Sequence, residues 1–530
     1  MTKHDVVIYN ARIIDGKGNP WRRGNVAIKD GRISQIGRII ETDAREHIDA
    51  QGMFVCPGFI DTHSHSDFVY FIDSTAQSKV RQGVTTEVTG NCGFSGAPWT
   101  EVHSPITIPG FSPKWTTMKE YLEALVSIGK PVNIAPLVGH NTLRTAIVGL
   151  ENRPCTSAEL EQMVGVLADS LRAGAHGLST GLYFAPGSYA TREELRKLFE
   201  VAACYGTIVT SHIRDEGTRT VGFLSAIREI LDIAGEAQVP VHISHIKVHG
   251  PAVWGSSTKV LELIEEGRRR GIEVSCDQYP YEATGGSIAD DTLPLSFLEG
   301  KTRGDISREL EKADVRRGLH PVVAANIEQR GGASRLTIAD YAANPQLQGK
   351  TIQEHAEERG TSPADAVMLM LAEGKGCKAH WICFSLKDED VEDFMRYAGT
   401  MIGSDGSGLS TKGPLSGGYP HPRNFGAFPR ILRLYVKEKR VLRLEDAIRK
   451  MTSLPAQTFG LSDRGVLEEG NWADIVIFEL EEIIDAPYDN PKRYPEGIPY
   501  VMVNGEWVIK RGDFTGNLPG QALQHRILAL

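Results

Sequence analysis

The sequence predicts an α/β protein: a (β/α)₈ TIM barrel with a small β-sandwich domain formed from both chain termini. Eight short strand-like runs alternate with helical stretches in the centre of the chain, which is typical of such a barrel. Both ends show the apolar–polar alternation of half-buried strands. The length of 530 residues is greater than one compact hydrophobic core can accommodate, so we expect a large domain with a smaller one.

The two chain ends share one pattern. The first 55 residues alternate in stretches such as DVVIYNARIID and GNVAIKDGRISQIG, separated by the turns DGKGNP and KDG. Residues 465–512 continue this style in GVLEEGNWADIVIFEL and PYVMVNGEWVIKRG. We therefore predict one β-sandwich domain from residues 1–55 and 465–530, with the barrel between them at residues 56–464.

The strand-like runs of the centre are separated by amphipathic stretches such as SAIREILDIAGEAQ. The eight runs cover residues 54–65, 83–93, 131–140, 175–181, 207–216, 240–250, 272–281 and 399–407. The gap between the seventh and eighth runs is much longer than the others and contains helical segments such as SPADAVMLMLAEG. We predict an insertion at about residues 283–397, between barrel strands 7 and 8, which covers the catalytic face.

Composition excludes several classes of protein. The net charge of -9 comes from scattered charges, which gives neither a nucleic-acid footprint nor a polybasic membrane patch. No stretch approaches the roughly 18 apolar residues that a membrane span needs, and the N-terminus lacks a signal-peptide pattern. The seven cysteines are odd in number and widely spread, which favours a reducing compartment over a disulfide framework. We expect a cytoplasmic protein.

Four histidines lie where predicted strands end. His63 and His65 are two residues apart, so on a strand both rings point to the same face. His212 and His245 each follow a β-branched run and precede charged residues. Taken alone, His63 and His65 could be a pair of half-buried, hydrogen-bonded histidines, and His212 or His245 would more often be structural than a ligand. Together they lie at the carboxyl ends of barrel strands, where barrel enzymes place their active sites, and they predict a metal site.

Asp405 and Cys92 share this placement. Asp405 follows the eighth run, and because the last barrel strand lies beside the first, it would face His63 and His65. The alternative is an ordinary Asp-Gly turn. Cys92 ends the second run between two glycines, which would let the backbone come close to an ion; an isolated cysteine is otherwise a small buried side chain. Imidazole, carboxylate and thiolate donors together fit zinc.

The chain resembles the D-aminoacylase (N-acyl-D-amino-acid deacylase) family of the amidohydrolase superfamily over nearly its whole length. The matching segments are PGFIDTHSHSD, QGVTTEVTGNCGFS, GLSTGLYFAPGSYAT, SHIRDEG, ISHIK, DQYPYEATGGS, IGSDGS and HPRNFGAFPR. The NCG segment is the most specific, because most relatives bridge their metals with a carboxylated lysine where this family uses a cysteine.

The resemblance implies zinc-dependent hydrolysis of N-acyl-D-amino acids to a carboxylate and a free D-amino acid. Cys92, His212 and His245 would hold one tightly bound Zn²⁺. His63 and His65, with Asp405 close by, would frame a second, weaker site that shares Cys92. Asp405 would also serve as general base and acid.

The resemblance also implies residues that bind the substrate carboxylate: Lys247, Tyr281, Ser287 and Arg423. For a single lysine or arginine the alternative is a solvated surface charge. The chain departs from the family pattern at Ile246 and Phe184, and its segment between Asp405 and Arg423 is longer. These departures leave the proposed metal ligands intact and leave the side-chain and acyl preference open.

Two other functions stay open from the sequence. A cyclic-amide hydrolase, similar to dihydroorotase or hydantoinase, would use the same zinc chemistry but usually needs the bridging lysine in place of Cys92. A non-catalytic protein on the same fold would typically lose metal ligands, and all six are present. We expect a small-molecule substrate and neither a nucleic-acid nor a membrane partner; the oligomeric state is not predicted.

Overall fold

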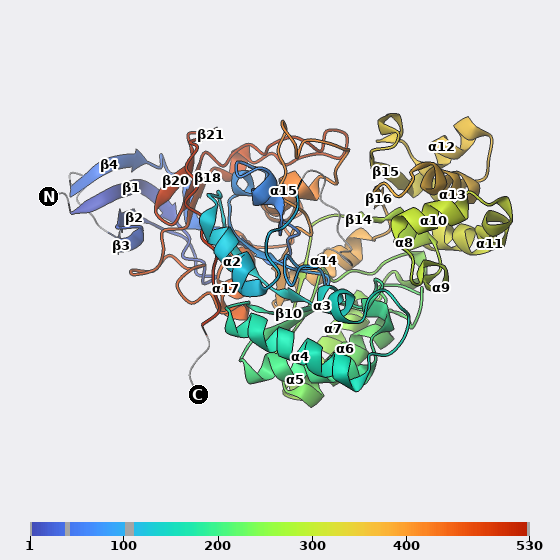
Figure 1. Ribbon diagram of the computed structural model, residues 1–530. Coiled ribbons are helices and arrows are strands. Elements are labelled where there is room, and N and C mark those ends of the chain that lie inside the picture. Colours follow the sequence, from blue (N-terminus) through green and yellow to red (C-terminus); the bar gives the residue numbers. More distant parts are fainter. Residues whose placement is uncertain (1–2, 38–42, 101–110, 527–530) are drawn as a thin grey trace.

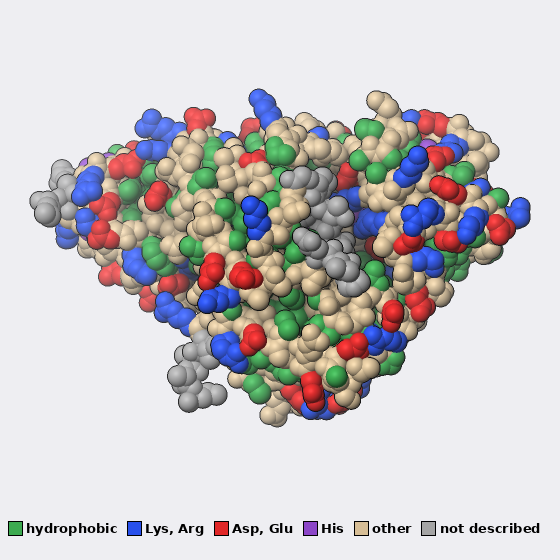
Figure 2. Space-filling view, viewed as in Figure 1, with side chains coloured by type: hydrophobic (Ala, Val, Ile, Leu, Met, Phe, Trp, Pro, Cys, Tyr) green, Lys and Arg blue, Asp and Glu red, His purple; other side chains and the backbone are tan. Residues whose placement is uncertain are grey.

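A computed structural model describes residues 3–37, 43–100 and 111–526. Three parts lie in a row (Figure 1): a β domain with the N-terminus, a central barrel with its helices, and a helical lobe drawn in yellow at the far end. On the face shown in Figure 2, the coloured Lys and Arg side chains are interspersed with Asp and Glu over the barrel and the lobe. No helix among the described residues combines the length and apolar character needed to cross a membrane.

The centre is the predicted parallel barrel. Its strands are β6 (Phe59–Asp61), β7 (Val84–Thr89), β8 (Asn133–Pro136) continued by β9 (Val138–Gly139), β10 (Gly177–Gly181), β11 (Ile208–His212), β12 (Val241–Ile243), β13 (Val274–Gln278) and β17 (Thr400–Ile402). They pair in the orders β6-β7-β8 and β9-β10-β11-β12-β13-β17. A parallel bridge between Ser64 and Gly406 joins the last strand to the first. Each predicted run contains one of these strands, which confirms the barrel.

The barrel helices cover the outside of these strands, because their apolar faces pack inward. They include α2 (Met118–Ser127), α3 (His140–Ile147), α4 (Ser157–Arg172), α5 (Arg192–Cys204), α6 (Phe223–Ala237) and α7 (Ser257–Arg269). After β17 come α15 (Arg423–Arg430), the π-helix η7 (Ile431–Glu438), α16 (Leu444–Met451) and α17 (Ser453–Thr458). In α6, Ile227, Ile230 and Ala234 recur at helical spacing and are fully buried.

The β domain is one nine-stranded sheet from both chain ends. Its strands are β1 (His4–Ile13), β2 (Arg22–Lys29), β3 (Arg32–Gly37), β4 (Ala44–Asp49), β5 (Phe54–Pro57), β18 (Ile475–Phe478), β19 (Tyr500–Val503), β20 (Glu506–Lys510) and β21 (Asp513–Phe514). The sheet folds over, since the indole of Trp507 on β20 donates to Glu46 on β4 at 3.2 Å. Side chains such as Val26 and Ile475 share one core.

The first predicted barrel run, residues 54–65, divides between the two parts. β5 belongs to the terminal sheet, where it pairs with β18, and only β6 enters the barrel. Gly58 lies between them, and a Cβ there would meet the Thr85 hydroxyl at 2.2 Å. A side chain would therefore not fit at the point where the chain passes from one sheet to the other. The exact domain boundaries stay a prediction.

The insertion between β13 and β17 has a core of its own, which includes Leu310, Ile338, Met368 and Trp381. Its elements are β14 (Thr284–Ser287), α8 (Ile288–Thr292), α9 (Leu295–Leu298), α10 (Arg303–Leu310), α11 (Ala313–Gln329), β15 (Leu336–Tyr341), α12 (Ile352–Arg359), α13 (Pro363–Glu373) and β16 (Ala379–Cys383). α14 (Asp388–Arg396) lies in the predicted range but packs on α7. Its Asp390 accepts from the Gly255 amide at 2.8 Å, so α14 belongs to the ring of barrel helices.

Candidate metal centre and active site

The predicted donor side chains all lie at or just after the carboxyl ends of barrel strands; His212 is itself the last residue of β11. The donors lie at the ends of β6, β7, β11, β12 and β17 and are His63, His65, Cys92, His212, His245 and Asp405. The structure brings these six side chains together in two groups that share Cys92. The convergence follows from the barrel, because the carboxyl ends of all its strands open onto one face.

The Cys92 thiol is at the centre of three histidines. Its Sγ lies 3.2 Å from His63 Nε2, 3.2 Å from His245 Nε2 and 3.4 Å from His212 Nδ1. Nitrogen and sulfur ligands of one tetrahedral zinc are about 3.6 Å apart, given usual bond lengths. The spacing and the chemistry of Cys92, His212 and His245 therefore fit one zinc ion.

The second group lies beside the first. His65 Nε2 is 3.0 Å and His63 Nε2 is 3.7 Å from the same Asp405 oxygen. These three side chains and Cys92 have potential ligand atoms within 4.8 Å of one another. The arrangement can hold a second ion that shares the Cys92 sulfur, and His65 is its most exposed member, with a third of its side chain accessible.

Three of the six donors have a left-handed backbone. The φ angles are 54° for Cys92, 35° for His245 and 51° for Asp405. A residue with a side chain adopts such angles at a cost of about 1–3 kcal/mol, and such residues cluster at functional sites. The surrounding barrel therefore fixes these three turns, which aim the donors inward.

The two glycines that flank Cys92 pack closely against neighbouring segments. A Cβ on Gly90 would lie 2.4 Å from the Leu137 carbonyl, and one on Gly93 would lie 2.2 Å from the Asn141 side chain. The glycines thus allow the NCG turn to pack against the next barrel strand and helix α3. This packing requires glycine at both positions, and the predicted close approach of the backbone to an ion stays a prediction.

Burial keeps three of the donor histidines, His63, His212 and His245, neutral. Burial lowers the pKa of His63 and of His212 well below the ordinary value, and burial with the nearby Lys247 lowers that of His245 to about 3. A neutral imidazole offers a free lone pair to a metal. The three rings are therefore in the form that ligates zinc.

Two buried acids behind the histidines were missed from the sequence. Glu216 lies 3.3 Å from His245 Nδ1 and 3.5 Å from His212 Nε2. Asp277 accepts from the Thr62 hydroxyl at 2.6 Å and lies 3.1 Å from His242. Burial alone would raise the pKa of Asp277, but His242 and its other partners hold it well below the usual range. Such carboxylates orient the residues of a metal site.

A buried charge network, also not predicted, lies beneath Asp405. Lys79 Nζ donates to Asp61 at 2.7 Å and to the Ser404 hydroxyl at 2.6 Å. Glu87 is 3.6 Å from the same ammonium group and accepts from the Ser64 hydroxyl. The network joins the loop after β6 to the loop after β17, which carry the second group of donors.

Two predicted carboxylate binders, Lys247 and Arg423, are buried beside the donors. Lys247 Nζ lies 2.5 Å from Glu216 and 2.7 Å from His245 Nδ1. Arg423 Nη1 donates to Asp405 at 2.8 Å. Burial and ion pairing contradict the alternative of a solvated surface charge at both positions.

Tyr279, which was not predicted, lies closer to this group than the predicted Tyr281, whose role in substrate binding stays a prediction. The Tyr281 ring packs under Arg430, 4.7 Å from its guanidinium carbon, and 5.0 Å from the His421 ring. Tyr279 instead lies 4.9 Å from the Arg423 guanidinium and 5.8 Å from Lys247 Nζ. The hydroxyls of Tyr279 and Tyr281 are both buried without a hydrogen-bond partner in the described part of the chain, so the neighbouring cations are what distinguishes them.

Ser287, the other predicted substrate contact, ends β14 in the insertion. Its hydroxyl accepts from the Asp290 amide at 3.3 Å and caps helix α8. Gly285, two residues earlier, lies against Arg423, since a Cβ there would be 3.3 Å from Nη2. The start of the insertion therefore borders the site, as predicted, while Ser287 itself is engaged in the helix cap.

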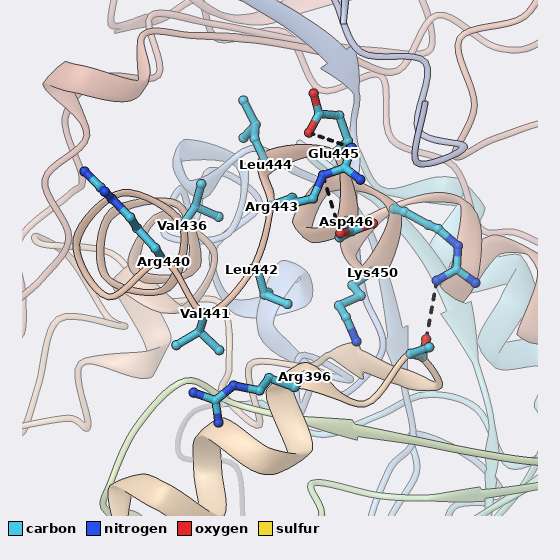
Figure 3. Close-up of a pocket in the computed structure, with 12 residues that line it drawn as sticks. Arg396, Val436, Arg440, Val441, Leu442, Arg443, Leu444, Glu445, Asp446 and Lys450 are labelled. Atoms are coloured by element: carbon cyan, nitrogen blue, oxygen red, sulfur yellow. Dashed lines mark hydrogen bonds and ion pairs between the residues drawn. The ribbon is translucent and has the colours of Figure 1, made fainter. Parts of the chain in front are cut away.

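A surface pocket of about 660 Å³ lies at the opposite end of the barrel. Lys450 in its lining donates to the carbonyl of Thr400, the first residue of β17, whereas Asp405 follows the end of that strand. Figure 3 shows Arg443 turned toward Glu445 and Asp446, at 3.6 and 4.0 Å, while Arg396 and Arg440 point apart. This pocket takes no part in the site.

A parallel (β/α)₈ barrel with histidine, cysteine and carboxylate donors at its carboxyl-terminal mouth defines a class, the metal-dependent barrel hydrolases. The family comparison agrees with this class. The amidohydrolase family matches residues 46–288 and 413–509. The chain belongs to this family, in the branch that contains the D-aminoacylases.

Three relatives align over nearly the whole chain. An N-acyl-D-glutamate deacylase of Alcaligenes xylosoxydans xylosoxydans is 35% identical over 98% of this chain and 97% of its own. A D-aminoacylase structure, described by its binuclear metal centre with one-metal activation and second-metal attenuation, has 34% identity, coverage of 98% and 100%, and a TM-score of 0.83. The Bordetella bronchiseptica N-acyl-D-glutamate deacylase with zinc and a phosphonate inhibitor has 32% identity, the same coverage and a TM-score of 0.82.

Proposed function

We propose that this chain is a zinc-dependent N-acyl-D-amino-acid deacylase that releases a carboxylate and a free D-amino acid. One observation carries the proposal: the Cys92 sulfur lies within 3.4 Å of His63, His212 and His245. The relatives that are at least 33% identical over 98% of the chain are named D-aminoacylase, N-acyl-D-glutamate deacylase and N-acyl-D-aspartate deacylase, whereas the dihydroorotases that align over 96% of it are only 22–23% identical. Both facts favour linear amides over the cyclic amides considered from the sequence.

The donor chemistry supports one tightly held zinc and a second, weaker position. Cys92, His212 and His245 would hold the first ion, and His63, His65 and Asp405 would complete the second with the shared sulfur. Zinc bound there supplies Lewis-acid polarisation of an amide carbonyl and lowers the pKa of water. The partial exposure of His65 fits a site that gains and loses its ion more easily.

Asp405 is the proposed proton carrier. Its carboxylate is buried at the mouth of the barrel, and burial alone would raise its pKa. Arg423 and the neighbouring histidines instead hold the pKa of Asp405 well below its usual range, so the group starts as a base. It would take a proton from the attacking water and return it to the amine nitrogen, because an amide cannot expel an unprotonated amide ion at useful rates.

Lys247 and Arg423 are the proposed partners of the substrate α-carboxylate, with Tyr279 as a neutral donor beside them. All three are buried around the donor groups, at the contacts described above. A planar guanidinium can hold a carboxylate by two parallel hydrogen bonds, which fixes both position and orientation. Holding the α-carboxylate would place the scissile amide over the ligands.

A substrate panel tests this function. The zinc-loaded protein is assayed with N-acetyl-D-leucine, hydantoin and dihydroorotate, and release of amino acid or opening of the ring is followed. We expect turnover of the linear amide alone. Ring opening without release of D-leucine would replace the proposal with the cyclic-amide alternative.

The proposed location is the cytoplasm. All seven cysteines are free thiols in the structure, and three of them, Cys56, Cys92 and Cys276, are buried near or within the barrel. Free thiols are typical of a reducing compartment. Fractionation of cells that express the chain, with the thiols labelled before lysis, checks this location.

A further inference from the structure

A polar cluster joins the insertion to the metal centre through Tyr183, the second residue after β10. The Tyr183 hydroxyl donates to Asp291 at 3.0 Å and accepts from Arg330 at 2.8 Å. Asp291 also accepts from the Trp381 indole at 2.8 Å and pairs with Arg330 at 3.1 Å. All four side chains are buried. The charges of Asp291 and Arg330 therefore cancel within the cluster.

The same tyrosine stands between the metal centre and a second arginine. The Tyr183 ring lies 5.3 Å from the ring of His212, at an interplanar angle of 34°. The guanidinium carbon of Arg219 lies over the Tyr183 ring at 4.5 Å. Arg219 is thus one aromatic ring away from a proposed zinc ligand.

Arg219 makes no direct ion pair in the described part of the chain, and Asp291, which pairs with Arg330, acts on its charge only from a longer distance. The Nη2 of Arg219 is buried without a hydrogen-bond partner there. Other arginines nearby differ: Arg214 pairs with Glu229 at 2.9 Å, and Arg330 with Asp291. A buried cationic donor without a partner is costly, which suggests that a ligand supplies the missing anion.

The loop that carries Arg219 is fixed before any ligand binds. The buried carboxylate of Asp215 accepts from the backbone amides of Gly217 at 2.9 Å, Arg219 at 3.3 Å and Gly222 at 3.0 Å. Three such bonds to one carboxylate hold the turn between β11 and α6. A preorganised loop spares the cost of ordering the arginine when a ligand arrives.

We propose that Arg219 binds a second carboxylate of the substrate and makes this enzyme selective for acidic N-acyl-D-amino acids. The inference rests on the proposed deacylase function. The α-carboxylate is assigned to Lys247, which contacts His245, and to Arg423, which contacts Asp405. Arg219 lies beside a different proposed zinc ligand, His212, with the Tyr183 ring between them. It is therefore free to bind another anion. That anion belongs either to the amino-acid side chain or to the acyl group.

Three substrates distinguish the two sources. Values of kcat and KM are measured on the zinc-loaded full chain with N-acetyl-D-leucine, N-acetyl-D-glutamate and N-succinyl-D-leucine. We expect one of the two dicarboxylates to exceed N-acetyl-D-leucine by at least tenfold in kcat/KM. Preference for the glutamate compound places the anion on the side chain, and preference for the succinyl compound places it on the acyl group.

Variants of Arg219 then connect the preference to this residue. In R219M, kcat/KM on the preferred dicarboxylate is expected to fall at least tenfold, mostly through KM, while that on N-acetyl-D-leucine changes less than threefold. R219K keeps the charge without the planar fork and should recover part of the loss. R317M, at an exposed arginine of α11, is the matched control for a general change in net charge.

Three outcomes would overturn the inference. Equal losses on all three substrates in R219M would make Arg219 a structural support of Tyr183 through its ring contact. Unchanged kinetics in R219M would remove it from binding. A wild-type enzyme that treats the three substrates alike would also refute selectivity, even if the variants fail to fold. By contrast, if the wild-type chain hydrolyses none of the three substrates, the proposed deacylase function itself is contradicted.

Discussion

Arg423 donates a hydrogen bond to Asp405 at 2.8 Å, and both side chains are buried at the mouth of the barrel. The contact joins the proposed binder of the substrate carboxylate to the proposed proton carrier. Asp405 Oδ1 meanwhile lies 3.0 Å from His65. The carboxylate is therefore held from two sides, and its two oxygens have separate partners.

Replacing this carboxylate should separate catalysis from zinc binding. In Asp405→Asn, kcat on N-acetyl-D-leucine is expected to fall by about 10²–10⁴, the usual contribution of a positioned acid or base. Zinc content should stay near that of the wild type, because Cys92, His212 and His245 remain. Asp388→Asn, at an exposed position of α14, is the control. Near-normal turnover with zinc bound would exclude the proton-transfer role.

Cys92 is the residue on which both donor groups depend. Cys92→Ala removes the shared sulfur, so zinc measured per chain by mass spectrometry should drop well below one equivalent after dialysis. Cys204→Ala changes an exposed cysteine and should leave the zinc content unaltered. Undiminished zinc in Cys92→Ala would remove the cysteine from the set of ligands.

Lys79 should be needed for stability. In Lys79→Met, Asp61 and Glu87 would remain buried without their cation. Breaking a buried ion pair in this way costs about 3–5 kcal/mol. For several hundred cooperatively unfolding residues this lowers the melting temperature by about 5 °C. Lys119→Met removes an exposed lysine and serves as the control; equal melting temperatures for both variants would contradict a structural role for the network.

Buried Glu194 on α5 pairs with two side chains of α3, His140 at 2.8 Å and Arg144. We expect this triad to make an acid-sensitive contribution to stability. Although burial opposes it, pairing with His140 and Arg144 lowers the pKa of Glu194 from 4.5 to about 2. Glu194 therefore stays ionised to a lower pH in the folded state than in the unfolded state, and its ionised form stabilises the fold. The stabilisation is fully present above pH 4.5 and is lost as the pH falls toward 2.

This contribution amounts to about 3 kcal/mol, at 1.36 kcal/mol per pKa unit. Unfolding free energies of the wild type and of Glu194→Gln are compared between pH 5 and pH 3, and the slope should be smaller in the variant. Glu161→Gln, at an exposed position of α4, should keep the wild-type slope. A slope in Glu194→Gln as steep as in the wild type would contradict the triad's role.

Much of the fold and of the donor set could be predicted because strand ends are readable in a sequence. A β-branched run followed by a polar residue marks the mouth of a barrel, and His212 and Asp405 both follow such runs. The supporting acids are harder to predict. Asp277 lies in a buried strand and Glu216 in a loop, and their importance arises only when the strands converge.

The choice between Tyr279 and Tyr281 shows another limit of the sequence. Residues two apart point to the same side while a strand continues. β13 ends at Gln278, so the alternation no longer holds at either tyrosine. Only the three-dimensional path of the chain around Pro280 shows that Tyr279 faces Arg423 and Tyr281 faces Arg430.

The most direct measurement of the central claim is a zinc titration of chelator-treated protein, with release of free amino acid followed for N-acetyl-D-leucine and N-acetyl-L-leucine. We predict that activity on the D-isomer is absent without metal, reaches most of its maximum near one equivalent of zinc, and exceeds activity on the L-isomer by at least a hundredfold. Hydrolysis that does not depend on zinc, or that prefers the L-isomer, would contradict a zinc-dependent N-acyl-D-amino-acid deacylase.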